Sequence, residues 1–182
     1  MRAFVGLGGN LGDRAGVLSA AAAALRDAAQ PGSFRASHLY ETRPWGMADQ
    51  PDFLNAVVSF DTSLDPTDLL AFLEGIETRF CRVRCERWGP RILDLDLLDL
   101  GGTVLSTGEL TLPHPRIEER GFVLVPLCEI EPGWRDPLTG RTAVEMLERL
   151  DPDPTEVRPA GRLSMGEGTT LADASRPALP RH

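Results

Sequence analysis

Hydrophobic and polar positions along the first part of the chain predict short strands and a helix. An apolar run over residues 2–7 predicts a strand, and the glycine-rich residues 8–13 predict a turn after it. Apolar residues recur at helical spacing over residues 18–29, which predicts a helix with one buried face. Strand patterns return over residues 33–41 and 53–60. The chain is therefore expected to begin with a strand, a helix and two further strands.

The pattern continues with a second helix and a fourth strand. Asp65 and Pro66 form a strong helix start, and the apolar stripe behind them extends to Phe80. Residues 89–90, Gly-Pro, interrupt the chain before residues 92–98, which alternate as in a strand. The order strand, helix, strand, strand, helix, strand predicts an α+β fold: a ferredoxin-like antiparallel sheet with helices packed on one face.

The remaining residues predict additional edge elements and a tail. Two short strand-like pieces cover residues 103–105 and 109–112, and an apolar helical run extends over residues 118–130. From residue 151 onward the chain is rich in Pro, Gly, Ala, Ser and charge, without an apolar period. We expect one domain over residues 1–150 and a mostly disordered C-terminal tail over residues 151–182.

Composition agrees with a single globular domain and excludes several kinds of chemistry. The chain has 182 residues, 42% of them hydrophobic, and a formal net charge of -8. No apolar run approaches the roughly 18 residues of a membrane span, and the first residues predict a strand rather than a signal peptide. We therefore expect a cytoplasmic protein without a membrane partner. All 19 basic residues are arginine, which excludes a Walker A lysine and lysine Schiff-base chemistry.

An arginine cluster stands next to a pair of aspartates in this acidic chain. The five arginines are Arg79, Arg82, Arg84, Arg87 and Arg91. Guanidinium groups bind phosphate oxygens through paired hydrogen bonds. Asp94 and Asp96 follow on one face of the predicted strand, about 6–7 Å apart, as hard oxygen ligands for a divalent cation. The combination indicates a metal-bound polyphosphate, and the alternative is a solvated basic loop before a strand with a wet acidic face.

Two other groups of residues are candidates for ligand contacts. Phe53 and Asn55 share one face of a predicted strand, where a ring and an amide can stack on a flat heterocycle and bind its edge. The alternative is a core phenylalanine beside a turn-related asparagine. His114 stands between two prolines with arginines close by, which suits either a phosphate contact or a structural role. Trp45 lies in a proline-bounded loop over residues 42–51, a candidate lid.

Four sequence blocks carry a family resemblance. In chain order they are Q-P-D-F-L-N-A at 50–56, E-R-W-G-P-R-I-L-D-L-D at 86–96, P-H at 113–114 and E-R-G-F at 119–122. Together they resemble the 6-hydroxymethyl-7,8-dihydropterin pyrophosphokinases of the folate pathway. The resemblance covers roughly residues 3–150. It implies transfer of an intact pyrophosphoryl group from ATP to the pterin hydroxymethyl oxygen, with AMP as the second product.

The resemblance also implies a role for each candidate residue. Two Mg²⁺ ions would be held by Asp94 and Asp96, which with Arg82 and Arg91 form the catalytic group. The side chains implied to bind ATP are Arg82, Arg84, Trp88, Arg91, His114 and Arg120. Those implied to bind the pterin are Thr42, Pro44, Trp45, Phe53, Asn55 and Phe122. The partners implied are small molecules and no nucleic acid, and we expect a monomer.

Two departures from the family pattern, and two other protein classes, bear on this interpretation. Many relatives carry tyrosine at the position of Phe53; phenylalanine keeps the stacking ring but not a hydroxyl contact. Some relatives carry tyrosine at the position of Pro115, and this chain lacks any nucleotide contact that such a tyrosine makes. Palm-like nucleotidyltransferases and cyclases also place a D-x-D metal pair on a ferredoxin-like sheet, but they release pyrophosphate. An RNA-binding domain of this topology would favour a basic overall field, whereas this chain is acidic.

Overall fold

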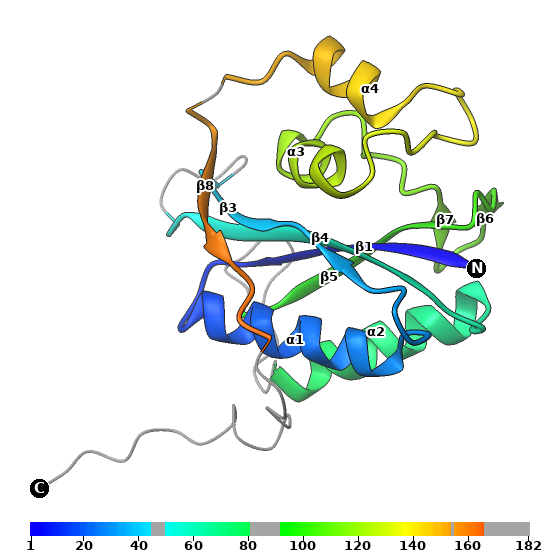
Figure 1. Ribbon diagram of the computed structural model, residues 1–182, viewed down its shortest axis with the longest axis horizontal. Helices are drawn as coiled ribbons and strands as arrows, with labels where there is room; N and C mark the ends of the chain where they lie inside the picture. The colour runs from blue at the N-terminus through cyan, green and yellow to red at the C-terminus, as the bar shows by residue number, and fades with distance from the viewer. Residues whose placement is uncertain (45–49, 81–91, 154, 166–182) are drawn as a thin grey trace, which may run out of the picture.

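The computed structural model describes residues 1–44, 50–80, 92–153 and 155–165 (Figure 1). The helices and strands in these ranges are β1 (Arg2–Gly9), α1 (Arg14–Ala28), β2 (Arg35–Ala36), β3 (His38–Thr42), β4 (Phe53–Asp61), α2 (Pro66–Phe80), β5 (Asp94–Leu100), β6 (Leu105–Ser106), β7 (Thr111–Leu112), α3 (Gly121–Ile130), α4 (Ala143–Leu150) and β8 (Val157–Arg162). Among the described helices, none is long and apolar enough to cross a membrane.

The main sheet has the order β5-β1-β4-β3-β8, and β2 also pairs with β4. Its neighbouring strands are antiparallel in every described pair. The inner order β5-β1-β4-β3, with α1 after β1 and α2 after β4, is that of a ferredoxin-like layer. The predicted fold class is therefore confirmed.

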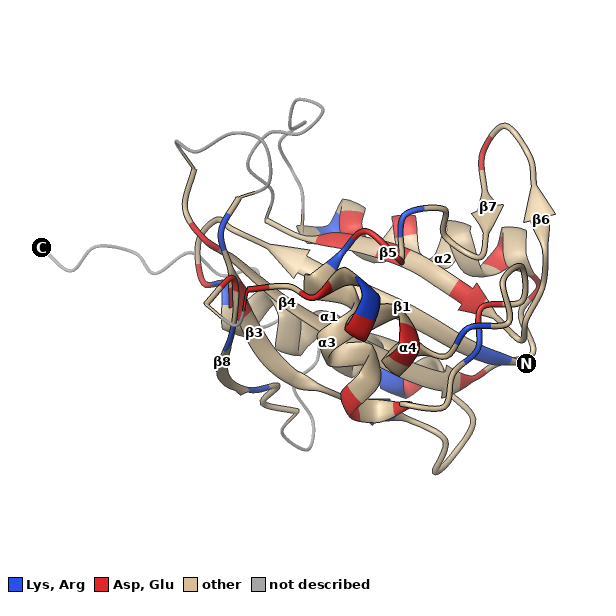
Figure 2. Ribbon diagram, turned by 90° about the horizontal axis from the view of Figure 1, so that it is seen from above, with Lys and Arg blue, Asp and Glu red and all other residues tan. Residues whose placement is uncertain are grey.

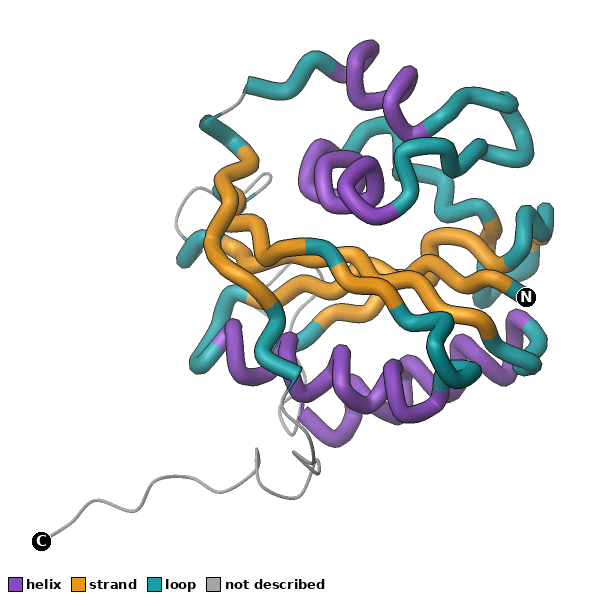
Figure 3. The backbone as a smooth tube through the Cα atoms, in the orientation of Figure 1, coloured by secondary structure: helices purple, strands orange, loops and turns teal. Residues whose placement is uncertain are grey.

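Helices α1 and α2 cover one face of the sheet, as predicted (Figures 1 and 3). Asp13 caps α1, since its Oδ1 accepts a hydrogen bond of 3.0 Å from the Gly16 backbone N–H. The apolar stripes of the two helices meet alternate residues of the strands in one large core cluster. Representative members of this cluster are Leu18, Leu25, Leu69, Leu73, Leu95 and Leu97.

The opposite face of the sheet is also covered, which corrects the prediction that helices pack on one face only. Helix α3 lies against the sheet and α4 lies outside α3 (Figure 1). A second core cluster joins Phe4, Val57 and Leu98 of the strands to Leu124 and Leu127 of α3. Both faces of the inner strands are therefore apolar over this part of the sheet.

The tail prediction is wrong for the part of it that the structure describes as a strand. Val157–Arg162 form β8, which pairs with β3 at the edge of the sheet (Figure 3). Main-chain hydrogen bonds hold an edge strand without an apolar repeat, and the side chains of β8 are mostly exposed. After β8, Leu163 and Met165 pack against the α1/α2 core cluster. Residues 166–182 lie outside the described ranges.

Candidate active site

The register of three strands aligns an amide, a glycine and a carboxylate. Gly8 of β1 lies opposite both Asn55 on β4 and Asp94 on β5. Opposite residues of antiparallel strands point to the same face, and strands are spaced about 4.8 Å apart, so the two side chains start about 10 Å from each other. Gly6 lies in the same way beside Asp96. Gly6 and Gly8 thus lie between the Asn55 amide and the two carboxylates of β5, and we call this pair of residues the glycine floor.

Gly6 and Gly8 are site residues that the sequence analysis missed. It placed Gly8 in a turn, but β1 extends to Gly9. A Cβ atom at Gly8 would lie 3.0 Å from Asn55 Oδ1, which is closer than ordinary van der Waals contact. Glycine at alternate positions inside a buried strand is the available signal, because it marks close approach of a neighbour or a ligand.

The two aspartates of β5 share the face that α3 covers. Leu95 and Leu97, which alternate with them, lie in the core under α1 and α2. Both carboxylates remain partly exposed. Arg120, the residue before α3, donates from Nη1 to Asp96 Oδ2 at 2.7 Å, with only 13% of its side chain exposed. Figure 2 shows the acidic residues along β5 with basic residues beside them.

A divalent cation could use the Asp94 and Asp96 carboxylates as its protein ligands. Mg²⁺ is commonly bound through one or two carboxylates, with the remaining positions taken by water and substrate phosphates. Within the described ranges there is no group of three or more His, Cys, Asp or Glu side chains arranged to hold a metal. The pair therefore fits a cation that phosphate oxygens would help to bind, and not a site built from protein ligands alone.

His114 lies close enough to Asp96 for the two charges to interact. Its backbone N–H donates to the Leu98 carbonyl at 2.8 Å, and its Nδ1 accepts from the Arg116 backbone N–H at 3.2 Å. Burial lowers the pKa of His114 below the ordinary histidine value; Asp96 opposes this effect, and Arg120 and Arg116 add to it. With Nδ1 as acceptor, the neutral ring carries its proton on Nε2, a hydrogen-bond donor suited to an anion.

A buried amide and two aromatic rings lie next to this charged group. Asn55 donates from Nδ2 to Thr42 Oγ1 at 2.8 Å, and both side chains are buried. Thr42 is the register partner of Phe53, the first residue of β4. Phe53 and Phe122 are half-buried. The structure therefore brings together four of the residues assigned to the pterin: Thr42, Phe53, Asn55 and Phe122. We call these four residues the pterin slot. The Nδ2 end of the Asn55 amide is hydrogen-bonded to Thr42.

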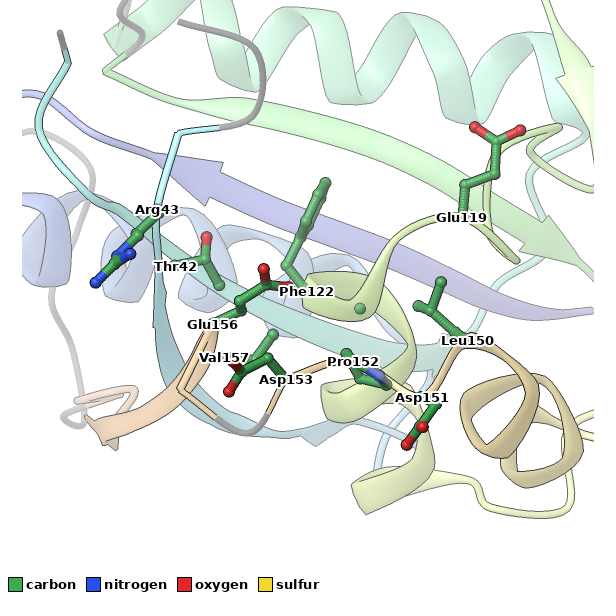
Figure 4. A pocket seen from close by; sticks show the side chains of 11 residues that line it. Thr42, Arg43, Glu119, Phe122, Leu150, Asp151, Pro152, Asp153, Glu156 and Val157 are labelled. Atoms are coloured by element: carbon green, nitrogen blue, oxygen red, sulfur yellow. The ribbon is translucent and has the colours of Figure 1, made fainter. Parts of the chain in front are cut away.

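Thr42 and Phe122 also line one cavity of about 410 Å³ (Figure 4). In this view the Phe122 ring extends from the start of α3 toward the strands, beside Thr42. Arg43 lies beside Thr42, and residues 150–153, 156 and 157 contribute much of the cavity wall. The sequence analysis had assigned no role to this C-terminal segment.

Arg120 connects the charged group to the aromatic group. Its guanidinium holds Asp96, and its Cζ lies 5.6 Å from the centroid of the Phe122 ring. A cation over an aromatic face is attracted by the negative charge of the ring. Arg120 therefore contacts both the Asp96 carboxylate of β5 and the Phe122 ring at the start of α3.

The remaining predicted site residues are placed as follows. Pro44 is half-buried and follows β3 after Arg43. The other five lie outside the described residues: Trp45, Arg82, Arg84, Trp88 and Arg91. Their assignments stay predictions.

Comparison with known proteins gives one family for the chain. The family described as 7,8-dihydro-6-hydroxymethylpterin-pyrophosphokinase matches residues 4–132. A curated relative from Synechocystis sp., named 2-amino-4-hydroxy-6-hydroxymethyldihydropteridine pyrophosphokinase, is 46% identical over 149 residues, which is 82% of this chain and 76% of the relative. A relative of the same name from Methylorubrum extorquens is 46% identical over 157 residues, 85% of this chain and 97% of the relative.

Solved structures agree with the fold. The crystal structure of Plasmodium falciparum HPPK-DHPS with pteroate superposes with a TM-score of 0.65 and 15% sequence identity, covering 81% of this chain and 42% of that chain. This likeness, at low identity and over less than half of the longer protein, supports the fold alone. The identities with the curated relatives and the match over residues 4–132 show that the chain belongs to the 7,8-dihydro-6-hydroxymethylpterin-pyrophosphokinase family.

Proposed function

We propose that this protein transfers the pyrophosphoryl group of ATP to the hydroxymethyl oxygen of 6-hydroxymethyl-7,8-dihydropterin and releases AMP, a step of folate biosynthesis. The names of its relatives support the reaction, since they are called pyrophosphokinases of this pteridine. The observation that carries the proposal is the double contact of Arg120, with the Asp96 carboxylate and with the Phe122 ring. Through these two contacts, Arg120 joins the candidate cation and phosphate site on β5 to the candidate binding site for a flat ring at Phe122.

In the proposed reaction, the hydroxymethyl oxygen attacks the β-phosphorus of ATP. A bond forms between that oxygen and the β-phosphorus, the bond from the β-phosphorus to the bridging oxygen of AMP breaks, and the hydroxyl proton is released. The protein supplies no nucleophile. Catalysis of such a transfer consists of positioning the two substrates and stabilising charge on the phosphate oxygens.

On the phosphate side, Asp94 and Asp96 would hold two Mg²⁺ ions, which would supply positive charge for the phosphate groups. His114 would donate from Nε2 to a phosphate oxygen, and its lowered pKa keeps the ring neutral near pH 7. Arg120 is already ordered by its partners, so a phosphate meets a guanidinium that needs little reorganisation. We retain Arg82, Arg84, Trp88 and Arg91 as further ATP ligands.

On the pterin side, Phe53 and Phe122 would stack on the ring, and the Asn55 Oδ1 would accept from its edge. In the structure the Thr42 hydroxyl accepts from Nδ2 of Asn55, so the Oδ1 end of the amide is the one directed to the ligand in this proposal. The backbone around Pro44 and Trp45 would bind the rest of the ring edge. We also propose that the enzyme acts as a monomer in the cytoplasm.

Product analysis tests the reaction. The purified protein is incubated with ATP, Mg²⁺ and the hydroxymethyl pterin, and the nucleotides are separated by chromatography. AMP is expected to appear in a one-to-one ratio with the pterin diphosphate. If ADP or pyrophosphate forms in place of AMP, the proposed function is wrong, and pyrophosphate in particular indicates a nucleotidyltransferase.

A further inference from the structure

Arg158 of β8 bridges two carboxylates, one from β3 and one from the residue before β4. Its Nη2 lies 3.3 Å from Glu41 Oε2 and 3.1 Å from Asp52 Oδ2. Glu41 belongs to β3 and is the register partner of Arg158, while Asp52 is the residue before β4. A side chain from the C-terminal strand therefore connects the end of β3 to the start of β4.

The two acids are the immediate neighbours of residues in the pterin slot. Glu41 precedes Thr42, and Asp52 precedes Phe53. Thr42 and Phe53 are themselves register partners between β3 and β4. Successive residues of a strand point to opposite faces, so Glu41 points away from the face that carries the slot. The bridge thus acts on the main chain that holds Thr42 and Phe53 and leaves the slot itself open.

Arg14 completes the network from the α1 side. It donates from Nη2 to Glu41 Oε1 at 3.1 Å and from Nη1 to the Asp52 carbonyl at 2.5 Å. Two arginines, one from α1 and one from β8, therefore hold the Glu41 carboxylate, and they contact Asp52 through its carbonyl and its carboxylate respectively. Each ion pair is partly exposed, with 51% of the Arg158 side chain and 30% of the Glu41 side chain accessible. A single ion pair of this kind contributes little to the free energy of folding. A network in which two arginines share the same partners restricts the positions of all the side chains in it.

The C-terminal segment also reaches the slot from the other face. Leu150, Pro152 and Val157 line the cavity that contains Thr42 and Phe122 (Figure 4). Val157, the residue before Arg158, is the register partner of Thr42. Strand β8 therefore contacts the pterin side twice, through the ion network on one face and through the cavity wall on the other.

We propose that Arg158 is a positioning residue for the pterin. By holding Glu41 and Asp52, it sets the separation of β3 from β4 where Thr42 and Phe53 meet the ring. This inference rests on the proposed function. Because ATP would bind on the β5 side of the sheet, the effect of losing Arg158 should fall on the pterin and spare ATP.

The test compares two arginines of the same strand. Arg158→Ala removes the bridge, and Arg162→Ala removes a β8 arginine that donates to His38 Nε2 instead. We expect Arg158→Ala to raise the KM for the pterin by about five-fold, the factor that corresponds to one or two partly exposed ion pairs, and to leave the KM for ATP unchanged. Arg162→Ala should leave both constants unchanged. Thermal unfolding of both variants checks that β8 is retained.

A conservative variant and salt separate positioning from a general loss of structure. Arg158→Lys should recover most of the pterin affinity, because one nitrogen of Arg158 contacts both acids. The difference between wild type and Arg158→Ala should shrink between about 0.05 M and about 1 M NaCl, since salt screens exposed charges. Equal effects of the two alanine variants, or an equal rise in both KM values, would overturn the proposal. An inactive wild-type protein would instead refute the proposed function.

Discussion

At the scale of single residues, the carboxylates of β5 differ in what they contact. Asp96 is paired with Arg120, so removing its side chain would also leave a nearly buried arginine without this partner. Asparagine keeps an oxygen for Arg120 and removes only the negative charge. Asp96→Asn therefore separates the proposed role in cation binding from the role in holding Arg120.

We expect Asp96→Asn to lower kcat by at least about a hundred-fold, because the charge on the transferring phosphate is then less well compensated. The midpoint of urea unfolding should change little. Asp27→Asn, an exposed acid at the end of α1, serves as the control for a lost charge. Turnover at the wild-type rate in Asp96→Asn would remove the assignment of this carboxylate to the metal.

The Thr42 hydroxyl offers a second test at this scale. Thr42→Val keeps the shape of the side chain but leaves Asn55 Nδ2 without the acceptor it has now. We expect the KM for the pterin to rise by about five- to ten-fold, the cost of one unmade buried hydrogen bond. Thr42→Ser retains the hydroxyl and should bind the pterin as wild type does. Steady-state kinetics with the pterin varied at saturating ATP distinguish the two variants.

Several residue positions could be predicted from local sequence because strand geometry alone determines them. The alternation of Asp94 and Asp96 with leucines places both carboxylates on one face without knowledge of the rest of the chain. The pairing of Asn55 with Thr42 could not be predicted in this way. It depends on the β3–β4 register, which the sequence of neither strand specifies.

At the scale of elements, the sequence predicted which segments form the inner sheet and that helices cover one face of it, but not that α3 covers the other face. The helical spacing of apolar residues and the capping residues identify α1 and α2. The position of α3 depends instead on its contacts with Phe4, Val57 and Leu98, which come from three different strands. These residues are far apart in sequence. Strand β8 lacks an apolar repeat and is fixed by backbone pairing with β3, so composition gave the wrong expectation for it.

The close approach of β1 to the segment just before β5 yields a prediction at this scale. A Cβ at Gly9 would lie 2.4 Å from the Ile92 carbonyl oxygen, and a backbone atom cannot move aside as a flexible side chain can. Gly9→Ala should therefore destabilise the fold by about 1–3 kcal/mol, as overpacking does. In Gly6→Ala the nearest atoms would be 3.7 Å away, an ordinary contact, so its unfolding midpoint should stay near that of wild type.

Urea unfolding of Gly9→Ala and Gly6→Ala measures the free energy of unfolding of each variant and so tests this prediction. Similar stabilities of Gly9→Ala and Gly6→Ala would mean that β5 can shift away from β1 at little cost. That result would also argue against a fixed distance between the glycine floor and the Asp94 and Asp96 carboxylates.

At the scale of the whole molecule, a polar cluster ties the sheet to α3 on the edge away from Asp94 and Asp96. Glu129 of α3 accepts hydrogen bonds from the His38 backbone N–H and from the Tyr40 hydroxyl, both at 2.9 Å, and its other oxygen contacts His38 Nδ1. Burial and this carboxylate raise the pKa of Tyr40 to about 12. The cluster thus holds α3, which carries Phe122, against β3, which carries Thr42.

Glu129 makes the strength of this tie depend on pH. Burial alone would raise its pKa, but the hydrogen bonds from His38 and Tyr40 outweigh burial and hold the pKa below the ordinary glutamate value. A carboxyl group with a lowered folded-state pKa stabilises the fold above the unfolded-state value, and this stabilisation is lost as the pH falls through the folded-state value. The tie should therefore be complete at pH 7 and weaken in acid.

Glu129→Gln removes the charge while keeping one oxygen that can accept. We expect it to lower the free energy of unfolding by about 1 kcal/mol at pH 7, a modest figure because solvent screens this partly exposed cluster. The difference from wild type should narrow as the pH falls below about 4.5, where the carboxyl group of the unfolded chain also takes up a proton. Glu148→Gln, at an exposed position on α4, should show no such dependence. A difference that stays constant between neutral and acid pH would mean that the charge of Glu129 does not hold α3 to β3.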